Sequence, residues 1–221
     1  MINKKINLIF DFDSTFIQLE TIEVLAKYAL NNNNNKISIA KKIKSMTNLA
    51  MSGKLSFKKA LSDRISLLEL NPTHIDRTSK FLFNKISPSF NENINFIKEN
   101  KRNCYIVSGG FKNIIFDIVK EFDFIDDNIF ANELICHKND TILLDTNNPL
   151  SLDNGKSKVV KQIKGHNIII GDGYTDYEVK KYGHADIFIQ YIENVNRKGL
   201  NNKADCIATN FQDIINFIKN V

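Results

Sequence analysis

The sequence predicts an α/β fold in which a parallel sheet carries helices on both faces and a small helical cap is inserted after the first strand. Three short apolar runs, each rich in β-formers, lead into polar or glycine-rich turns at residues 6–10 (INLIF), 103–110 (NCYIVSGG) and 167–173 (NIIIGDG). Helical patterns lie between these runs, and this alternation is typical of a parallel sheet. The length of 221 residues favours one core with a smaller inserted unit over two full-sized domains.

The segment between the first and second strands is the predicted cap. Residues 16–86 contain helical patterns and no convincing strand, so we assign residues 1–15 and 87–221 to the core. Apolar residues share one stripe in residues 20–30, and Ser56 is the expected N-cap of a further amphipathic helix.

Composition also predicts the connecting and closing elements. The asparagines at 31–35 indicate a solvated connector between two cap helices, because asparagine disfavours helix interiors and suits turns. Residues 111–122 predict a helix, and a small hairpin is expected around residues 138–140. Residues 210–221 have an amphipathic pattern and are expected to close the chain as a helix.

Two aspartates directly follow the first strand. In extended backbone, residues two apart point to the same side, so Asp11 and Asp13 can face one ligand beyond the carboxyl end of the strand. Such a pair repels itself unless a cation lies between the carboxylates or one of them holds a proton, and phosphoryl transfer uses both arrangements. Taken alone, the pair is also compatible with ordinary surface acids at a strand end.

Two more carboxylates, Asp172 and Asp176, follow the third strand and are expected at the same edge of the sheet. Clustered oxygen ligands suit Mg²⁺, which binds through one or two carboxylates and retains water and substrate phosphate oxygens. These turns contain no histidine, which argues against zinc. The pattern therefore predicts Mg²⁺ as the cofactor.

The second strand ends in Ser108, Gly109 and Gly110, where a hydroxyl and exposed amides ahead of a helix can hold phosphate oxygens. In most proteins such a sequence is only a turn. Lys156 precedes the third strand by the length of a helix and can neutralise a phosphate as a point cation, with Lys158 as the competing candidate. An isolated lysine is usually a solvated surface residue, so this assignment depends on the neighbouring motifs.

Together these segments resemble the haloacid dehalogenase-like phosphatases and, within them, the phosphoserine phosphatases. Residues 11–15 (DFDST) match the family's first motif, Ser108 the second, Lys156 the third and residues 171–176 (GDGYTD) the fourth, in the family's order. The resemblance covers nearly the whole chain. It implies a Rossmann-like core with a helical cap inserted after the first motif.

By this resemblance, Asp11 is the nucleophile that becomes a transient phosphoaspartate, and Asp13 is the general acid. Asp11, Asp172 and the main-chain carbonyl of Asp13 are expected to bind Mg²⁺, while Asp176 holds a metal-bound water. Asp13 would protonate the seryl oxygen, which is otherwise a poor leaving group, and then act as base for the hydrolytic water. Mg²⁺ and Lys156 would offset the repulsion between an anionic nucleophile and the phosphate.

The same resemblance implies a substrate, O-phosphoserine, through residues of the cap. Glu20 and Arg64 match the residues that family members use for the substrate's ammonium and carboxylate, and arginine can bind a carboxylate bidentately. Met51 and Phe57 are expected to shield the site from water. The expected substrate-binding set is completed by Ser108, Gly109, Gly110 and Thr175. The alternative is that Glu20 and Arg64 are ordinary exposed helix charges.

Two other activities would use the same residues. A phosphotransferase would pass the group from the phosphoaspartate to an acceptor alcohol such as homoserine, and a broader small-molecule phosphatase would accept sugar phosphates or nucleotides. A non-catalytic binding module is disfavoured, because it has no reason to keep both a nucleophile and a proton donor. The resemblance favours hydrolysis of a small phosphorylated amino acid, with the phosphotransferase and the broader phosphatase as alternatives.

Charge and cysteine content limit which cellular compartment and which partners are expected. The net charge of +5 is spread along the chain without a block of basic residues, so no nucleic-acid partner is expected. Cys104, Cys136 and Cys206 are far apart and suggest neither a disulfide framework nor a zinc site. The N-terminal apolar run is too short for a signal peptide or a membrane span. We expect a cytoplasmic protein, a monomer or a homodimer, without a membrane partner.

Overall fold

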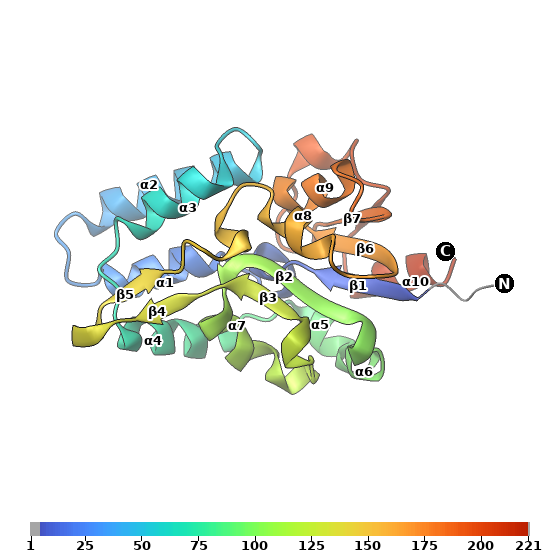
Figure 1. Cartoon of the computed structure of the whole chain (residues 1–221), viewed down its shortest axis with the longest axis horizontal. Coiled ribbons are helices and arrows are strands. Elements are labelled where there is room, and N and C mark those ends of the chain that lie inside the picture. The colour runs from blue at the N-terminus through green and yellow to red at the C-terminus, as the bar shows by residue number, and fades with distance from the viewer. Residues whose placement is uncertain (1–4, 221) are drawn as a thin grey trace.

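The computed structural model describes residues 5–220 and is organised around a six-stranded sheet in the order β3-β2-β1-β6-β7-β8 (Figure 1). Every neighbouring pair in this sheet is parallel, which confirms the predicted fold class. The strands are β1 (Ile6–Phe10), β2 (Cys104–Phe111), β3 (Ile129–Asn132), β6 (His166–Gly171), β7 (Ile187–Tyr191) and β8 (Cys206–Ala208). Residues 1–4 of the predicted core and residue 221 of the predicted closing helix lie outside the described residues.

The direction in which strands are added reverses next to β1. From β1 the chain runs outward through β2 to β3, then returns to β6 on the other side of β1 and continues to β7 and β8. In open parallel sheets, ligands bind beyond the carboxyl ends of the strands at such a reversal. The ends of β1, β2 and β6, the three strands predicted from the sequence, therefore meet at one crevice.

Helices cover both faces of the sheet, as predicted. Alternate residues of β1 show the two layers, because Phe10 packs into one hydrophobic cluster and Ile9 into the other. The face of Phe10 is covered by α5 (Pro88–Glu92), α6 (Ile94–Glu99), α7 (Lys112–Val119) and α10 (Phe211–Ile218). The face of Ile9 is covered by α8 (Gly155–Val160) and α9 (Tyr174–Lys181). The helices predicted at 111–122 and 210–221 correspond to α7 and α10.

The segment between β1 and α5 is helical. It contains α1 (Thr21–Ala29), α2 (Lys36–Met51), α3 (Phe57–Ile65) and α4 (Pro72–Phe83). Helix α1 packs against α4 and α2 against α3, while α4 also contacts α7 of the core. The connector predicted at 31–35 separates α1 from α2, and the predicted N-cap of α3 is confirmed, since the Ser56 side chain accepts a hydrogen bond from the Lys59 N–H.

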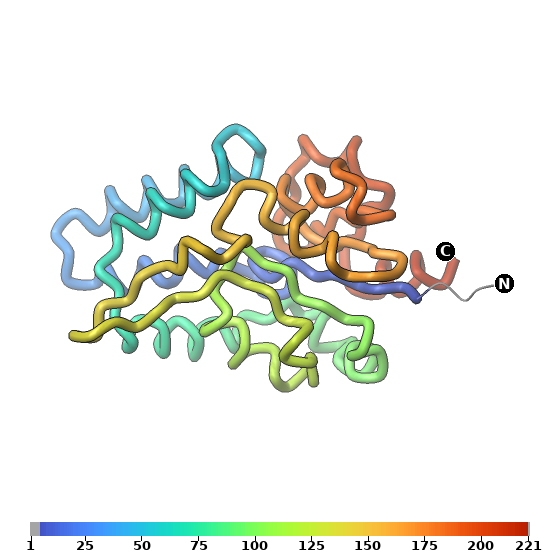
Figure 2. Tube along the Cα trace, viewed as in Figure 1, coloured from blue at the N-terminus to red at the C-terminus, as the bar shows by residue number. Residues whose placement is uncertain are grey.

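A short antiparallel hairpin lies against these helices. Strand β4 (Leu134–Cys136) pairs with β5 (Ile142–Leu144), and the turn falls at 138–140 as predicted. The Ile142 N–H donates to the Leu70 carbonyl at 3.2 Å, so the hairpin runs beside the inserted segment (Figure 2). Within residues 5–220, no helix combines the length and the apolar character needed to cross a membrane.

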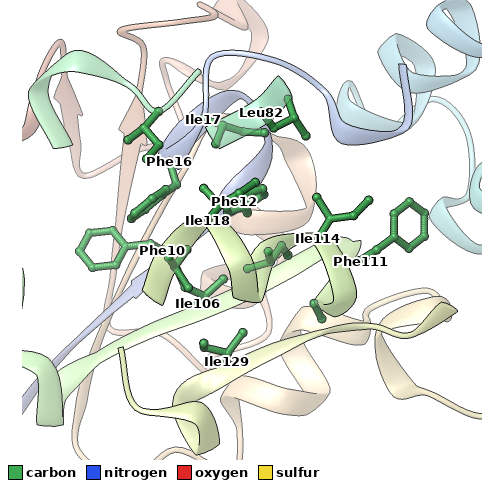
Figure 3. Packing of buried hydrophobic residues seen from close by; sticks show 14 of the residues in the cluster. Phe10, Phe12, Phe16, Ile17, Leu82, Ile106, Phe111, Ile114, Ile118 and Ile129 are labelled. Carbon is green, nitrogen blue, oxygen red and sulfur yellow. The ribbon is translucent and has the colours of Figure 1, made fainter. Parts of the chain in front are cut away.

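Two phenylalanines anchor the turn that follows β1 in the main hydrophobic cluster. Phe12 and Phe16 are fully buried, and their rings stack at 5.9 Å between centroids (Figure 3). Phe16 also lies 4.7 Å from Phe90 and 4.8 Å from Phe122, again between ring centroids. Such aromatic pairs contribute about 0.5–1.5 kcal/mol beyond the burial of their surface. The packing therefore fixes the backbone that carries Asp13.

Replacing Phe16 by alanine is expected to lower the free energy of unfolding by about 3–5 kcal/mol, because it removes a buried ring and leaves a cavity. Phe116, which is 39% exposed, provides the control, and Phe116→Ala should cost less than about 1 kcal/mol. Urea denaturation followed by circular dichroism measures both variants. Equal losses would contradict the role assigned to Phe16.

Candidate active site

Three aspartates converge beyond the carboxyl ends of the adjacent strands β1 and β6. Asp11 follows β1, Asp172 follows β6, and Asp176 lies in the first turn of α9. The Asp11 N–H donates to the Ile170 carbonyl at 2.8 Å and keeps the two strand ends together. One carboxylate oxygen from each aspartate lies within 4.8 Å of the others, and all three residues are buried. The distant acidic segments therefore meet at one point.

Lys156 supplies positive charge to this cluster. Its Nζ lies 2.7 Å from Asp11 Oδ1 and 2.7 Å from Asp176 Oδ1, and its side chain is only 6% exposed. Burial works against a charged lysine, but the two carboxylates outweigh it, so the pKa of Lys156 is raised above its ordinary value. Lys158, the competing candidate, is exposed on the same helix, so Lys156 is the lysine that the fold brings to the cluster.

The aspartate cluster carries more negative charge than Lys156 balances. The pKa of Asp176 is raised to about 7, mainly by burial and then by the negative charge of Asp11. The positive charge of Lys156 opposes this shift. Burial also raises the pKa of Asp172 well above its usual range. Oxygen donors held this close together and with raised proton affinity fit a hard divalent cation in place of protons. The side chain of Asp13 lies outside this group of three.

Asp13 faces the pocket from the turn after β1. Its carboxyl accepts a hydrogen bond from the Thr21 hydroxyl, and its Oδ2 lies 3.6 Å from the position that a Cβ on Gly110 would occupy. Burial, and next the negative charge of Glu20, raises the pKa of Asp13 well above its ordinary value. A raised pKa makes a carboxyl group better suited to hold and donate a proton as a general acid.

The turn after Asp13 passes through a left-handed conformation at Ser14, with φ 54°, which is uncommon for a residue with a side chain. The Ser14 hydroxyl donates to Glu20 Oε1 at 2.8 Å. The side-chain amide of Asn194 donates to the carbonyls of Ser14 and Thr15 at 3.3 and 3.2 Å. These bonds hold Asp13 and Glu20 in a fixed relation across the turn.

The glycines predicted as a turn after the second strand instead lie within the carboxyl end of β2, where its pairing with β3 shifts register between Val107 and Phe111. Side chains on both sides hold this segment. Ser108 Oγ accepts a hydrogen bond from the Gly110 N–H at 2.9 Å, and the side-chain amide of Asn132 donates to the Gly109 carbonyl at 2.9 Å. A Cβ on Gly109 would lie 2.5 Å from the Phe57 ring, so a larger residue would displace that ring. The absence of a side chain at Gly109 therefore lets the inserted helix α3 lie close to β2.

A pocket between the core and the inserted helices collects the predicted side chains. From the core it is lined by Asp11, Asp13, Ser108, Gly109, Gly110, Lys156 and Thr175. From the inserted segment it is lined by Glu20, Met51, Phe57 and Arg64. It is also lined by three apolar residues that the sequence analysis did not assign, Ile22, Leu61 and Phe111. Asp172 and Asp176 lie in the buried cluster beside Asp11 instead.

The two charged residues of the inserted segment are largely buried. Arg64 is 3% exposed, so its interpretation as an exposed helix charge is wrong. Its Nε donates to the Ala60 carbonyl at 2.9 Å and its Nη1 to Thr47 Oγ1 at 2.8 Å, which uses two of its five N–H groups. Burial lowers the pKa of Arg64, and the charges of Glu20 and Asp13 oppose that shift. Glu20 and Arg64 thus bring opposite charges to one pocket.

Arg197 is a residue of the site that the sequence analysis missed. It follows β7, its Nε donates to Asp172 Oδ2 at 2.7 Å, and its Nη2 lies 3.3 Å from Glu20 Oε1. Arg197 therefore links the aspartate cluster to a charged residue of the pocket. Its segment, NVNRKG, has the composition of a solvated loop, and no spacing or periodicity distinguishes Arg197 from Lys198.

Arg197→Met is expected to lower the free energy of unfolding in EDTA by about 2–4 kcal/mol, because it leaves Asp172 and Glu20 without their cation. Added Mg²⁺ should recover part of the loss, since a bound divalent cation restores positive charge near Asp172. Lys198→Met, at the exposed neighbouring position, should change stability by less than about 0.5 kcal/mol. Urea denaturation with and without Mg²⁺ measures these effects. A loss that Mg²⁺ does not reduce would argue against this charge balance.

Similarity to known proteins extends over nearly the whole chain. No protein-family model matches the sequence. The chloroplastic phosphoserine phosphatase of Arabidopsis thaliana is 32% identical over 213 residues, which cover 94% of this chain and 70% of that protein. The crystal structure of a phosphoserine phosphohydrolase-like protein from Francisella tularensis matches with a TM-score of 0.85 and 31% identity, over 96% of this chain and 99% of that chain. A phospho-aspartyl intermediate analogue of phosphoserine phosphatase matches with a TM-score of 0.75 and 25% identity, over 97% and 98% of the two chains.

Proposed function

Because the chain belongs to the phosphoserine phosphatase family, we propose that it hydrolyses O-phosphoserine to serine and phosphate through a transient phosphoaspartate on Asp11, with Mg²⁺ as cofactor. The choice of substrate rests on one observation. Glu20 and Arg64, which have opposite charges, line the same pocket as Asp11 and Asp13. This pair suits the ammonium and the carboxylate of a free amino acid whose phosphate is directed at Asp11.

The residues that would hold Mg²⁺ are Asp11, Asp172, Asp176 and the main-chain carbonyl of Asp13. Carboxylate and carbonyl oxygens are the donors that this ion prefers, and the three buried aspartates exceed the positive charge that Lys156 and Arg197 supply. When bound, the ion would reduce the repulsion between Asp11 and the phosphate and polarise a phosphate oxygen. Asp176 is proposed to contact it through a water molecule.

The groups around Asp11 hold its carboxylate in place. Its Oδ1 lies 2.7 Å from Lys156 Nζ and accepts a hydrogen bond from the Phe12 N–H at 2.7 Å. One oxygen of this carboxylate is proposed to attack the phosphorus atom. The bond from phosphorus to the seryl oxygen breaks as Asp13 donates its proton to that oxygen, and serine leaves with a neutral hydroxyl group.

Hydrolysis of the phosphoaspartate restores the free enzyme. Asp13, now a carboxylate, takes a proton from a water molecule as that water attacks phosphorus. The bond between phosphorus and Asp11 breaks, phosphate leaves, and Asp11 is a carboxylate again. The raised pKa of Asp13 supports this assignment, because the group has to release and regain one proton in each turnover.

Substrate contacts come from both sides of the pocket. The phosphate oxygens are proposed to be held by Ser108, the amides of Gly109 and Gly110, Lys156 and Thr175. Thr175 Oγ1 is buried and has no hydrogen-bond partner within residues 5–220, which supports its use as a donor to a ligand. Met51 and Phe57 line the pocket from the inserted segment and are proposed to exclude water.

Asp11→Asn is expected to reduce phosphate release by at least about 10³-fold, because an amide does not form the acyl phosphate. The variant should still fold, since asparagine matches aspartate in shape and removes one of three mutually repelling carboxylates. Lys158→Ala, on the exposed side of α8, is the control and should keep the wild-type rate. Phosphate release and circular dichroism provide the two readouts. Turnover of Asp11→Asn near the wild-type rate would refute the mechanism.

Arg64→Ala should lower kcat/KM for O-phosphoserine by about 100-fold, because the substrate carboxylate loses its partner in a buried pocket. For p-nitrophenyl phosphate, which has neither a carboxylate nor an ammonium group, the loss should be less than about fivefold. Arg77→Ala, an exposed arginine of α4, should change neither value. Steady-state kinetics with both substrates tests this. An unchanged kcat/KM for O-phosphoserine would instead favour a broader small-molecule phosphatase.

A further inference from the structure

We propose that Asp153, a core residue in the loop before Lys156, is a positioning residue that holds helix α3 over the phosphate site. It lines none of the pocket that contains Asp11. The inference rests on the proposed function, because hydrolysis of O-phosphoserine is the reaction used to test it. Its physical basis is a contact between two distant segments of the chain.

Asp153 caps the N-terminus of α3 from outside the helix. Its two carboxylate oxygens lie 2.9 and 2.8 Å from Ser56 Oγ, which donates to them, and its Oδ1 accepts a hydrogen bond from the Lys58 N–H at 3.0 Å. The first N–H groups of a helix have no partner within the helix, and the helix dipole favours a negative charge there. Ser56 Oγ at the same time accepts a hydrogen bond from the Lys59 N–H at 3.3 Å. Asp153 of the core and Ser56, the N-cap of α3, therefore cap this helix together.

This contact joins two walls of the pocket. Helix α3 carries Phe57, whose ring is packed against Gly109, and Arg64, whose guanidinium lines the pocket. Three residues after Asp153 the chain reaches Lys156, which contacts Asp11. The loop and the inserted helices approach each other at this point (Figure 2). Asp153 thus ties the helix that selects the substrate to the loop that holds the phosphate-site lysine.

The inserted helices also cover the groups that are proposed to hold the phosphate, and α3 meets the core along a seam beside them. Asp11 is 3% exposed, Ser108 0% and Lys156 6%, so a phosphate reaches them only if the inserted helices move away from the core. At the seam the packing is tight, because a Cβ on Gly53 would lie 2.9 Å from the Tyr174 ring. Asp153 and Ser56 are exposed at the rim of this seam. A polar contact at the exposed rim can break and re-form without exposing the core.

An exposed capping contact of this kind shifts the population of the closed arrangement by a modest factor, about 3- to 10-fold. Closure favours the bound substrate and the transition state alike, since both use Phe57 and Arg64. Loss of the Asp153 contact therefore raises KM and leaves kcat unchanged, which distinguishes a positioning role from a role in the chemical step.

The test is steady-state kinetics on Asp153→Ala and Asp153→Asn. Asp153→Ala should raise KM for O-phosphoserine about 3- to 10-fold with kcat within twofold of wild type. Asp153→Asn should keep KM within about twofold, because one amide oxygen can still accept from Ser56 and from the Lys58 N–H. In a double-mutant cycle, the effects of Ser56→Ala and Asp153→Ala on KM should be less than additive, since both remove the same contact.

Asn210→Ala is the matched control, because Asn210 caps α10 by accepting from the Asp213 N–H at 3.0 Å and lies on a helix that does not line the pocket. It should lower stability without changing KM. The proposal is overturned if Asp153→Ala folds with wild-type KM, if it lowers kcat alone, or if Asn210→Ala raises KM equally. If the wild-type protein rejects O-phosphoserine but hydrolyses another phosphomonoester, the proposed substrate fails and the same comparison is made with that phosphomonoester.

Discussion

The contact of Lys156 with both Asp11 and Asp176 is the interaction on which the rest of the site depends. The parallel pairing of β1 and β6 brings three carboxylates together in a buried place, where like charges repel strongly. One lysine at the start of α8 makes this arrangement compatible with a folded protein, and Arg197 has the same effect on Asp172. The cluster nevertheless remains short of positive charge, which is why it suits a divalent cation.

The groups proposed for the chemical step and those proposed for substrate selection lie in different parts of the chain that share one turn. The core places its acidic groups at strand ends, and the stacked rings of Phe12 and Phe16 fix the backbone between them. Glu20 lies just beyond this turn and is held by the hydroxyl of Ser14. Glu20, which is proposed to contact the ammonium group of the substrate, is therefore positioned by the same backbone that positions Asp13. Packing of α3 against the core adds the opposite wall of the pocket.

The sequence predicted the central strands and the residues that meet at the buried cluster because β1, β2 and β6 are apolar runs that contain or precede distinctive polar or glycine-rich segments. Strands β3, β7 and β8 were missed. Strands β3 and β8 have only four and three residues, too few for a recognisable pattern, and β7 has five but is not followed by an aspartate pair or a glycine-rich segment. The burial of Arg64 depends on how α2 packs against α3, since its guanidinium donates to Thr47. Arg197 reaches Asp172 only through the folded path of the chain after β7, so no local pattern indicated it.

The most direct test is a crystal structure with Mn²⁺ substituted for Mg²⁺ and located by its anomalous scattering. One strong peak is expected, bound by the carboxylates of Asp11 and Asp172 and with Asp176 nearby. A peak remote from these aspartates, or none at a Mn²⁺ concentration that supports phosphate release, would contradict this expectation.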